Sequence, residues 1–178
     1  MKIYRASCDV GYQMLKTKND DYYEYITGGF KGEKMIDTWP TIEVKIQEHY
    51  FESDEADVVR FEFGAAFNQK SVDILKEEFK ENVEVLPLRY DKYPWFAINV
   101  TTVLDCLDEE KSKLVIRAKR VFAIEKYVFK KGISYPPIFK ITSFKIGIYV
   151  TEAFVKKFQE NNLTGMVFDL VWDSSNEL

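Results

Sequence analysis

Three side chains in this sequence are cysteine or histidine, the types that most often form a nucleophile–base pair or hold structural zinc: Cys8, His49 and Cys106. A cysteine activated by a histidine base is a common nucleophilic pair in enzymes. No motif flanks either cysteine or the histidine, so the sequence does not favour such a pair. Structural zinc sites usually need four cysteine or histidine ligands, and this chain has only three such residues in total. We therefore predict no catalytic residue and no metal site.

Adjacent carboxylates offer a second kind of chemistry, and they occur at 20–21, 54–55 and 109–110. Two carboxyl groups divide the roles of acid and base when burial separates their pKa values. All three pairs lie in polar, turn-like segments, so we expect solvated charges there. The glycine-rich segment 28–32 lacks the spacing of both common phosphate-binding motifs. It is expected to be a plain loop, and we predict no cofactor and no enzyme activity.

The start of the chain and its two cysteines indicate a compartment. The first ten residues contain no apolar stretch of the kind found in secretory signals. Cysteines in such a chain are more often free and buried than paired, although the sequence does not establish whether Cys8 and Cys106 form a disulfide. No apolar run approaches the roughly 20 residues that span a bilayer. These features predict a cytoplasmic protein that does not bind membranes.

The elements that would position these residues are mostly strands. Apolar Ile42, Val44 and Ile46 alternate with polar Glu43 and Lys45, which is typical of a half-buried strand. Similar patterns, with β-branched and aromatic residues, predict strands at residues 2–5 (as a short edge strand), 12–15, 22–26, 41–47, 58–63, 83–88 (ended by Pro87), 95–100, 114–116, 121–129, 138–141, 146–150 and 166–172.

Two or three helices interrupt these strands. Asn68 is a favourable N-cap for a helix over 69–79. A second helix begins after Thr151, since the apolar residues that follow fall on one helical face. A short third helix is predicted over 101–107. The sequence therefore predicts an α+β fold in which residues 1–178 form a single domain with a largely antiparallel β-sheet and two or three helices.

Charge is distributed unevenly along the chain. The formal net charge of −4 argues against nucleic acid as a partner, because bulk binding to phosphates needs a basic surface. Acidic residues concentrate in segment 43–62, and basic residues concentrate in segment 111–131. One interpretation is two solvated faces that partly complement each other. The other is an acidic surface that steers a basic partner.

Aromatic residues make up 16% of the chain, with tyrosines grouped near residues 22–25 and 90–93. Packing explains much of this excess, but tyrosine is also enriched at interface hot spots. On a strand, adjacent residues face opposite sides, so Tyr22 and Tyr23 would not both be buried. We therefore consider a partner-binding surface in which these tyrosines flank the acidic loop. Its predicted residues are Tyr22, Tyr23, Glu52, Asp54, Glu55, Asp57, Tyr90 and Tyr93.

Several segments resemble immunity protein family 11 of bacterial polymorphic toxin systems. They are FNQKSVDIL (67–75), VEVLPL (83–88), FAINVTTVLDCLDEEKS (96–112), IFKI (138–141) and IYVTEAFVKKFQENNLTGMVFDLVWDS (148–174). The resemblance implies an immunity protein, a cytoplasmic toxin inhibitor that binds its cognate toxin domain and neutralises it by protein–protein occlusion. The resemblance implies no catalytic residues in this chain.

An alternative function belongs to a different class of protein. The chain would then be an enzyme or a small-ligand-binding domain, with an aromatic pocket lined by Trp39, Trp95 and Trp172. The lack of a catalytic constellation counts against it. The sequence sets neither the identity of the toxin nor the oligomeric state.

Overall fold

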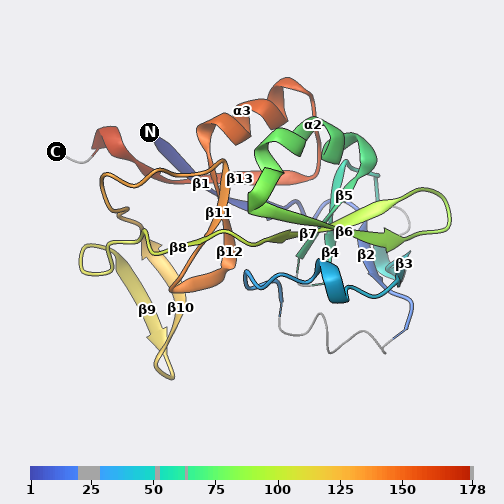
Figure 1. The fold of residues 1–178 in the computed structure, drawn as a ribbon, viewed down its shortest axis with the longest axis horizontal. Coiled ribbons are helices and arrows are strands. Elements are labelled where there is room, and N and C mark those ends of the chain that lie inside the picture. Colours follow the sequence, from blue (N-terminus) through green and yellow to red (C-terminus); the bar gives the residue numbers. More distant parts are fainter. Residues whose placement is uncertain (20–28, 51–52, 63, 177–178) are drawn as a thin grey trace.

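The structure, a computed structural model, describes residues 1–19, 29–50, 53–62 and 64–176. In these ranges the chain forms thirteen strands and two α-helices, arranged as a closed six-stranded barrel, a five-stranded sheet and a two-stranded hairpin (Figure 1). Most neighbouring strands run antiparallel, and three neighbouring pairs in the described ranges run parallel. The predicted α+β class with a largely antiparallel sheet is confirmed.

The barrel is built around an apolar interior to which all six strands contribute. Its strands, in spatial order, are β2 (Met14–Thr17), β3 (Ile42–Ile46), β6 (Val83–Arg89), β7 (Trp95–Val100), β5 (Gly64–Asn68) and β4 (Val58–Phe61). In β3 the predicted alternation is confirmed, since Ile42 and Val44 are fully buried and Glu43 and Lys45 are not. Phe30, from the glycine-rich segment, also packs into this interior. The described part of that segment is thus anchored by an aromatic ring.

The five-stranded sheet brings the two ends of the chain together. Its spatial order is β13 (Met166–Asp173), β1 (Lys2–Cys8), β12 (Phe144–Thr151), β11 (Ile138–Ile141) and β8 (Val103–Leu104). Strand β1 pairs on both sides, with Arg5 opposite Tyr149 on β12 and opposite Asp169 on β13. The prediction of a short edge strand at 2–5 was therefore wrong, because its partners come from residues more than a hundred positions away.

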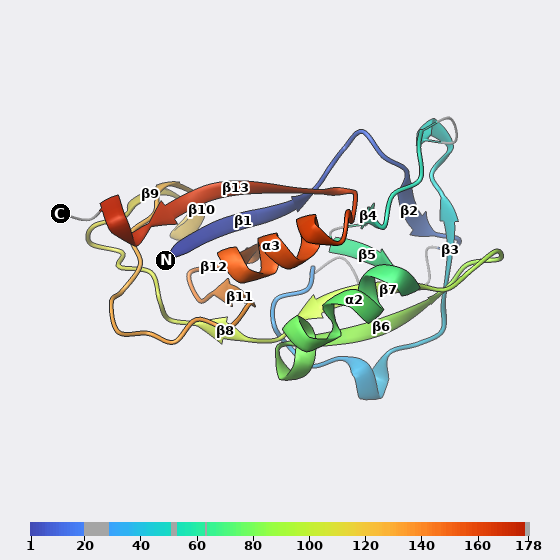
Figure 2. The same ribbon diagram turned by 90° about the horizontal axis from the view of Figure 1, so that it is seen from above.

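Both α-helices cover the same side of the molecule (Figures 1 and 2). Helix α2 (Gln69–Phe79) begins as predicted, since Oδ1 of Asn68 accepts a hydrogen bond from the backbone N–H of Ser71 at 2.9 Å. Helix α3 (Glu152–Glu160) follows Thr151, whose side chain makes no capping hydrogen bond. One buried cluster beneath the helices contains residues from the barrel and from the sheet, and it joins the two.

The predicted third helix at 101–107 was wrong. The backbone N–H groups of Thr101 and Thr102 donate to the carbonyl of Asn82, and Val103 pairs with Lys140 on β11. These distant partners hold the segment extended, and its β-branched residues suit that conformation. Elsewhere the described residues include short 3-10 turns at Ile36–Thr38 (η2), Glu48–Tyr50 (η3), Lys80–Asn82 (η4) and Ser174–Asn176 (η5).

Pro87 does not end its strand, as the sequence had suggested. Strand β6 continues to Arg89, and Pro87 lies opposite Phe96 on β7. The carbonyl of Pro87 accepts a hydrogen bond from the indole N–H of Trp39 at 3.0 Å. The nitrogen and the carbonyl of one residue face the same side of a strand, and at Pro87 this side is met by the Trp39 side chain rather than by another strand. No neighbouring strand therefore needs the N–H that proline lacks.

An aromatic cluster fills the space between the sheet and the hairpin of β9 (Lys113–Arg117) and β10 (Arg120–Lys126). Phe129 and Tyr149 lie at its centre, with ring centroids 6.3 Å apart. Tyr149 is fully buried on one face of β12 and Val150 is fully buried on the other, while Ile146 is 74% exposed. The alternation expected in β12 therefore does not separate a core face from a solvent face. Much of the aromatic excess in the sequence serves this cluster.

Lys140 is a charged residue buried in strand β11, with only 2% of its surface exposed. Its ammonium donates a hydrogen bond to the carbonyl of Lys145 at 2.8 Å. Burial lowers the pKa of Lys140 to about 8, and the charge of Glu33 acts weakly in the opposite direction. Among the described residues no carboxylate forms an ion pair with it.

We expect Lys140→Met to change how stability depends on pH. Between the folded pKa of about 8 and the unfolded value of 10.5 the unfolded chain binds a proton that the folded chain does not. Stability from this group therefore rises with pH across that window, by about 3 kcal/mol in total. The raised pKa values of the buried thiols and tyrosines make stability fall with pH above about pH 9. These groups are the same in both proteins, so the quantity to measure is the difference in the free energy of unfolding between Lys140→Met and the parent. Methionine does not titrate, so the free energy of unfolding of the variant relative to the parent should fall between pH 7 and pH 10, as measured by chemical denaturation. A difference that does not change with pH would contradict this expectation.

Candidate protein-binding surface

The structure separates the eight residues predicted to contact a partner. Tyr22, Tyr23 and Glu52 lie outside the described residues. Asp54 and Glu55 are exposed in the loop before β4, and Tyr90 and Tyr93 are half-buried in the turn between β6 and β7. Asp57 is buried in a polar network of its own.

Glu55, Tyr90 and Tyr93 come together with Asp54 beside them, and we call these four residues the tyrosine patch. The rings of Tyr90 and Tyr93 meet edge to face, with centroids 5.5 Å apart. Tyr93 also lies 6.0 Å from Trp95, which belongs to the barrel interior. Burial, followed by a hydrogen bond to Glu55, raises the pKa of Tyr93 to about 12. The phenol therefore stays neutral at physiological pH.

The loop that carries Asp54 and Glu55 is held in place by its backbone. Gln13 donates its backbone N–H to the carbonyl of Asp54 at 3.2 Å and its side-chain amide to the carbonyl of Ser53 at 3.0 Å. The carboxylates are thus displayed from an ordered loop next to two amphipathic rings. Such a surface suits protein recognition, because rigid tyrosines lose little entropy on binding.

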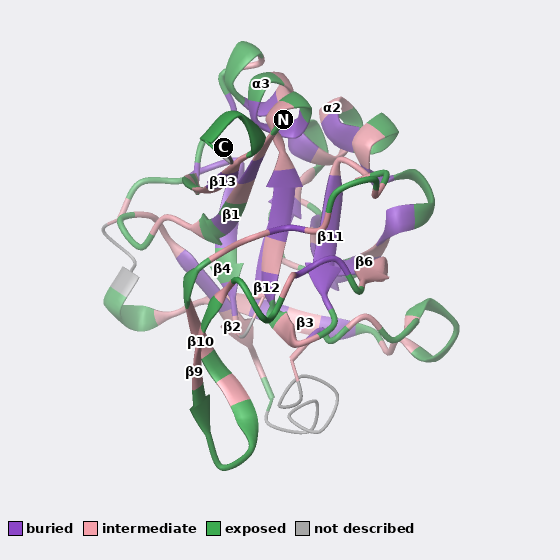
Figure 3. Cartoon of the chain, turned by 90° about the vertical axis from the view of Figure 1, so that its left-hand side faces the viewer, coloured by how far each residue is buried: buried purple, intermediate pink, exposed green. Residues whose placement is uncertain are grey.

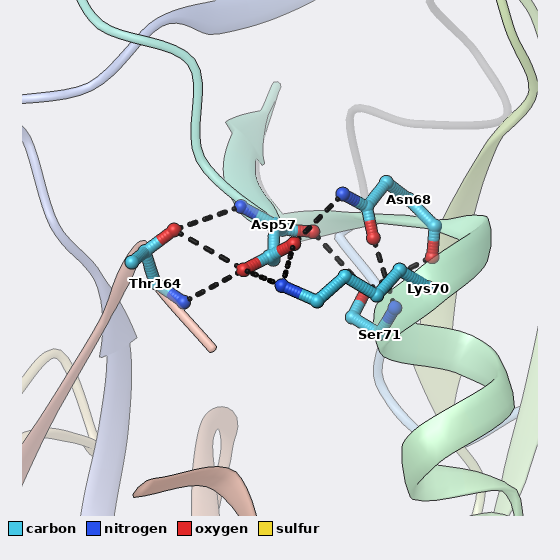
Figure 4. A network of polar contacts seen from close by, with 5 residues as sticks. All are labelled: Asp57, Asn68, Lys70, Ser71 and Thr164. Atoms are coloured by element: carbon cyan, nitrogen blue, oxygen red, sulfur yellow. Dashed lines mark hydrogen bonds and ion pairs between the residues drawn. The ribbon is translucent and has the colours of Figure 1, made fainter. Parts of the chain in front are cut away.

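Asp57, which was also predicted to contact a partner, is buried in a network of polar contacts with Asn68, Lys70, Ser71 and Thr164 (Figure 4). Its carboxylate accepts hydrogen bonds from the amide of Asn68 at 3.1 Å, the ammonium of Lys70 at 3.1 Å and the backbone N–H of Thr164 at 3.1 Å. Its backbone carbonyl accepts a further bond from the hydroxyl of Ser71. One carboxylate therefore ties the start of β4 to the first turn of α2 and to the loop between α3 and β13.

The pKa of Asp57 reports the strength of this network. Burial alone raises it, but the hydrogen bonds from Asn68, Lys70 and Thr164 outweigh burial and hold the pKa below the ordinary value of 3.8. The residue therefore remains charged above that pH. It is a structural carboxylate, and its signal in the sequence is the pair of polar residues that follow at 68 and 70.

The two cysteines are free thiols whose surroundings do not activate them. Cys8 and Cys106 are free, and burial raises the pKa of each thiol to about 12. Thiols with such values are protonated at neutral pH and are poor nucleophiles. His49 is exposed in η3. Across the described ranges no group of three or more His, Cys, Asp or Glu side chains is arranged to hold a metal ion.

The aromatic pocket expected from the alternative function is not formed by its three tryptophans. Trp95 and Trp39 pack at the barrel interior, whereas Trp172 is buried in the aromatic cluster behind the sheet. Trp172 instead lines a pocket of about 930 Å³ at the base of the β9–β10 hairpin. That pocket is rimmed by lysines at 111, 126, 130 and 131. Only the basic run in the sequence could have indicated it.

Comparison with known proteins gives one family. The model of the immunity protein family (Imm11) matches residues 70–173, more than half of the chain. The match covers both helices except the first residue of α2, together with the β6–β7 turn and the β9–β10 hairpin. No curated protein matches this chain. In the part of the chain that the structure describes, neither helix is long and apolar enough to cross a membrane.

Proposed function

Since the chain belongs to the immunity protein family (Imm11), we propose that it binds a cognate toxin domain of a bacterial polymorphic toxin system and neutralises it by covering the toxin's active site. The family points to an inhibitor rather than an enzyme and to a protein as its partner. We propose that inhibition occurs in the cytoplasm, that it requires no cofactor, and that neither nucleic acid nor membrane takes part.

The observation that carries this proposal, beside the family, is the tyrosine patch. Two tyrosines rest on the barrel core, and the carboxylate of Glu55, one residue after the exposed Asp54, lies close to Tyr93. A negatively charged, aromatic surface favours fast association with a basic partner and supplies buried area once the complex forms. Toxins that act on nucleic acids carry such basic surfaces, so we propose this patch as the contact with the toxin.

Co-expression with the toxin domain encoded beside this gene tests the function. We expect the two chains to purify as a complex and host growth to be restored, with a dissociation constant of roughly nanomolar or tighter. If the folded chain neither binds that toxin nor protects the host, the proposed function is wrong.

Variants in the tyrosine patch test the contact surface. We expect Glu55→Lys to weaken toxin binding by about tenfold, mainly through slower association, and Tyr93→Ala to weaken it by about tenfold or more through faster dissociation. Glu160→Lys makes the same charge change at the exposed end of α3 and should leave both rates unchanged. Kinetic binding measurements separate these effects. Parental rates in both patch variants would move the contact elsewhere while leaving the function intact.

A further inference from the structure

The β9–β10 hairpin is a separate two-stranded sheet that projects from the body on the side away from the helices (Figures 1 and 3). Its inner residues, among them Leu114 and Ile124, pack against the aromatic cluster. Its outer part exposes two large apolar side chains, with Ile116 at 63% and Phe122 at 57%. The guanidinium of Arg117 lies 4.1 Å from the centre of the Phe122 ring. Arginine and aromatic residues together are typical of interface hot spots.

The pairing of this hairpin places cations opposite cations. Arg117 lies directly across from Arg120, and Lys113 lies across from Lys126. Like charges directly opposite each other on neighbouring strands destabilise a hairpin. Within the described residues, Glu125 forms the hairpin's only ion pair, with Lys113 at 2.6 Å. The positive charge of the strands therefore remains largely uncompensated within the molecule.

The turn of the hairpin is also unfavourable for its sequence. Ala118 and Lys119 adopt positive φ angles of 47° and 62°. Two-residue turns with two positive φ angles favour Asn-Gly, because residues with a Cβ other than Asn and Asp are strained there. The chain thus keeps a strained turn and two repulsive pairs in one exposed arm. Strain of this kind concentrates at functional sites.

The pocket of about 930 Å³ continues this basic surface at the foot of the hairpin. Lys126, the last residue of β10, lies on its rim, and Phe129 and Trp172 contribute aromatic surface. Lys111 and Lys130 are held by ion pairs with Asp108 and Asp105, each at 2.8 Å, and Lys131 and Asp173 also line the pocket. An anionic side chain that reaches this pocket meets both cations and apolar surface.

We propose that the β9–β10 hairpin and the pocket at its foot bind an acidic surface of the protein partner, as a second contact distinct from the tyrosine patch. This inference rests on the proposed function, because the partner is the toxin domain. Charge complementarity supports it, since carboxylates across the interface would neutralise the opposed Arg117 and Arg120. A protein fits better than nucleic acid, because the chain as a whole carries a net charge of −4 and the arm exposes Ile116 and Phe122 beside its cations.

Arg120→Glu is the variant that tests this contact. It converts the repulsive Arg117–Arg120 pair into an attractive one and keeps Arg117 on the Phe122 ring, so the hairpin should fold at least as well as in the parent. We expect its complex with the toxin domain to be roughly tenfold weaker at low salt, with the difference shrinking as salt is raised. Lys156→Glu makes the same charge change on the exposed side of α3 and should bind as the parent does.

Each outcome decides a different point. If the parent binds the toxin and Arg120→Glu binds equally well, the hairpin contact is wrong and the proposed function stands. If the parent does not bind the toxin, both proposals fail. A 20-base-pair DNA duplex serves as the competing probe. Tight binding of that duplex to the parent, lost in Arg120→Glu while toxin binding is unchanged, would assign the arm to nucleic acid and overturn the proposal.

Discussion

Replacing Gly165 with alanine is expected to destabilise the fold by at least about 3 kcal/mol. Gly165 has a φ of +95°, and a Cβ added there would overlap the carbonyl oxygen of Val58. The neighbouring backbone has little freedom to move. Val58 donates its N–H to the carbonyl of Thr164 at 3.1 Å, and Asp9 donates to the carbonyl of Gly165 at 3.0 Å. The loop between α3 and β13 would have to break these bonds to admit a methyl group.

Gly132→Ala is the matched control for this substitution. Gly132 also has a positive φ, of +77°, but no atom lies within 4 Å of an added Cβ. Its replacement should cost only about 1–2 kcal/mol, from the backbone conformation alone. Chemical denaturation of the three proteins measures both effects. Equal losses in the two variants would show that the contact with Val58 is unimportant. The same curves test whether residues 1–178 unfold in one transition, as expected of a single domain.

The second large effect is expected at Asp57. Asp57→Ala removes the acceptor for Asn68, Lys70 and the backbone of Thr164, and it leaves these donors without their shared partner. We expect a loss of about 3 kcal/mol in the free energy of unfolding, because one buried, charged acceptor serves several donors. Asp54→Ala, three residues earlier on the exposed loop, should change stability by less than about 0.5 kcal/mol. Urea denaturation at pH 7 distinguishes them, and similar losses would contradict a structural role for Asp57.

The contribution of Asp57 also has a defined pH dependence. Because its folded pKa lies below the unfolded value of 3.8, its stabilisation is fully present above that value and is lost as pH falls through the folded pKa. Asp57→Asn has no carboxylate to protonate. The gap in stability between parent and Asp57→Asn should therefore be constant near neutral pH and should narrow below about pH 4. A gap that does not narrow in acid would mean that the carboxylate charge is not what stabilises the fold.

Local patterns predicted the elements that depend on local residues. Helix 69–79 and strand 95–100 have the bounds expected from the sequence, because a capping residue, apolar spacing and flanking turns mark them. The helix predicted over 101–107 does not form. The spacing of its apolar residues suited a helix, but its hydrogen-bond partners are Asn82 and β11. The place of β1 between two late strands also depends on distant pairing. Such information is absent from any short window of sequence.

The candidate surface shows the same division. Residue types alone indicated Glu55, Tyr90 and Tyr93, which the fold brings together. In the sequence Asp57 resembles the acidic residues around it. A hydrogen bond from Thr164, more than a hundred residues later, gives it a structural role. The pocket beside the hairpin was not predicted, because segments near residues 108, 129 and 172 assemble it. Sequence identifies which side chains suit an interface, and tertiary contacts decide which of them are exposed.

The position of β1 in its sheet has a consequence for protein synthesis. Ile3 lies opposite both Thr151 and Trp172, so β1 is synthesised well before the strands with which it pairs. At about 5–20 residues per second, translation delivers those partners on the order of ten seconds later. Until then β1 and the aromatic cluster behind it have no complete sheet to join. A nascent chain paused before residue 166 would therefore be unable to complete this sheet.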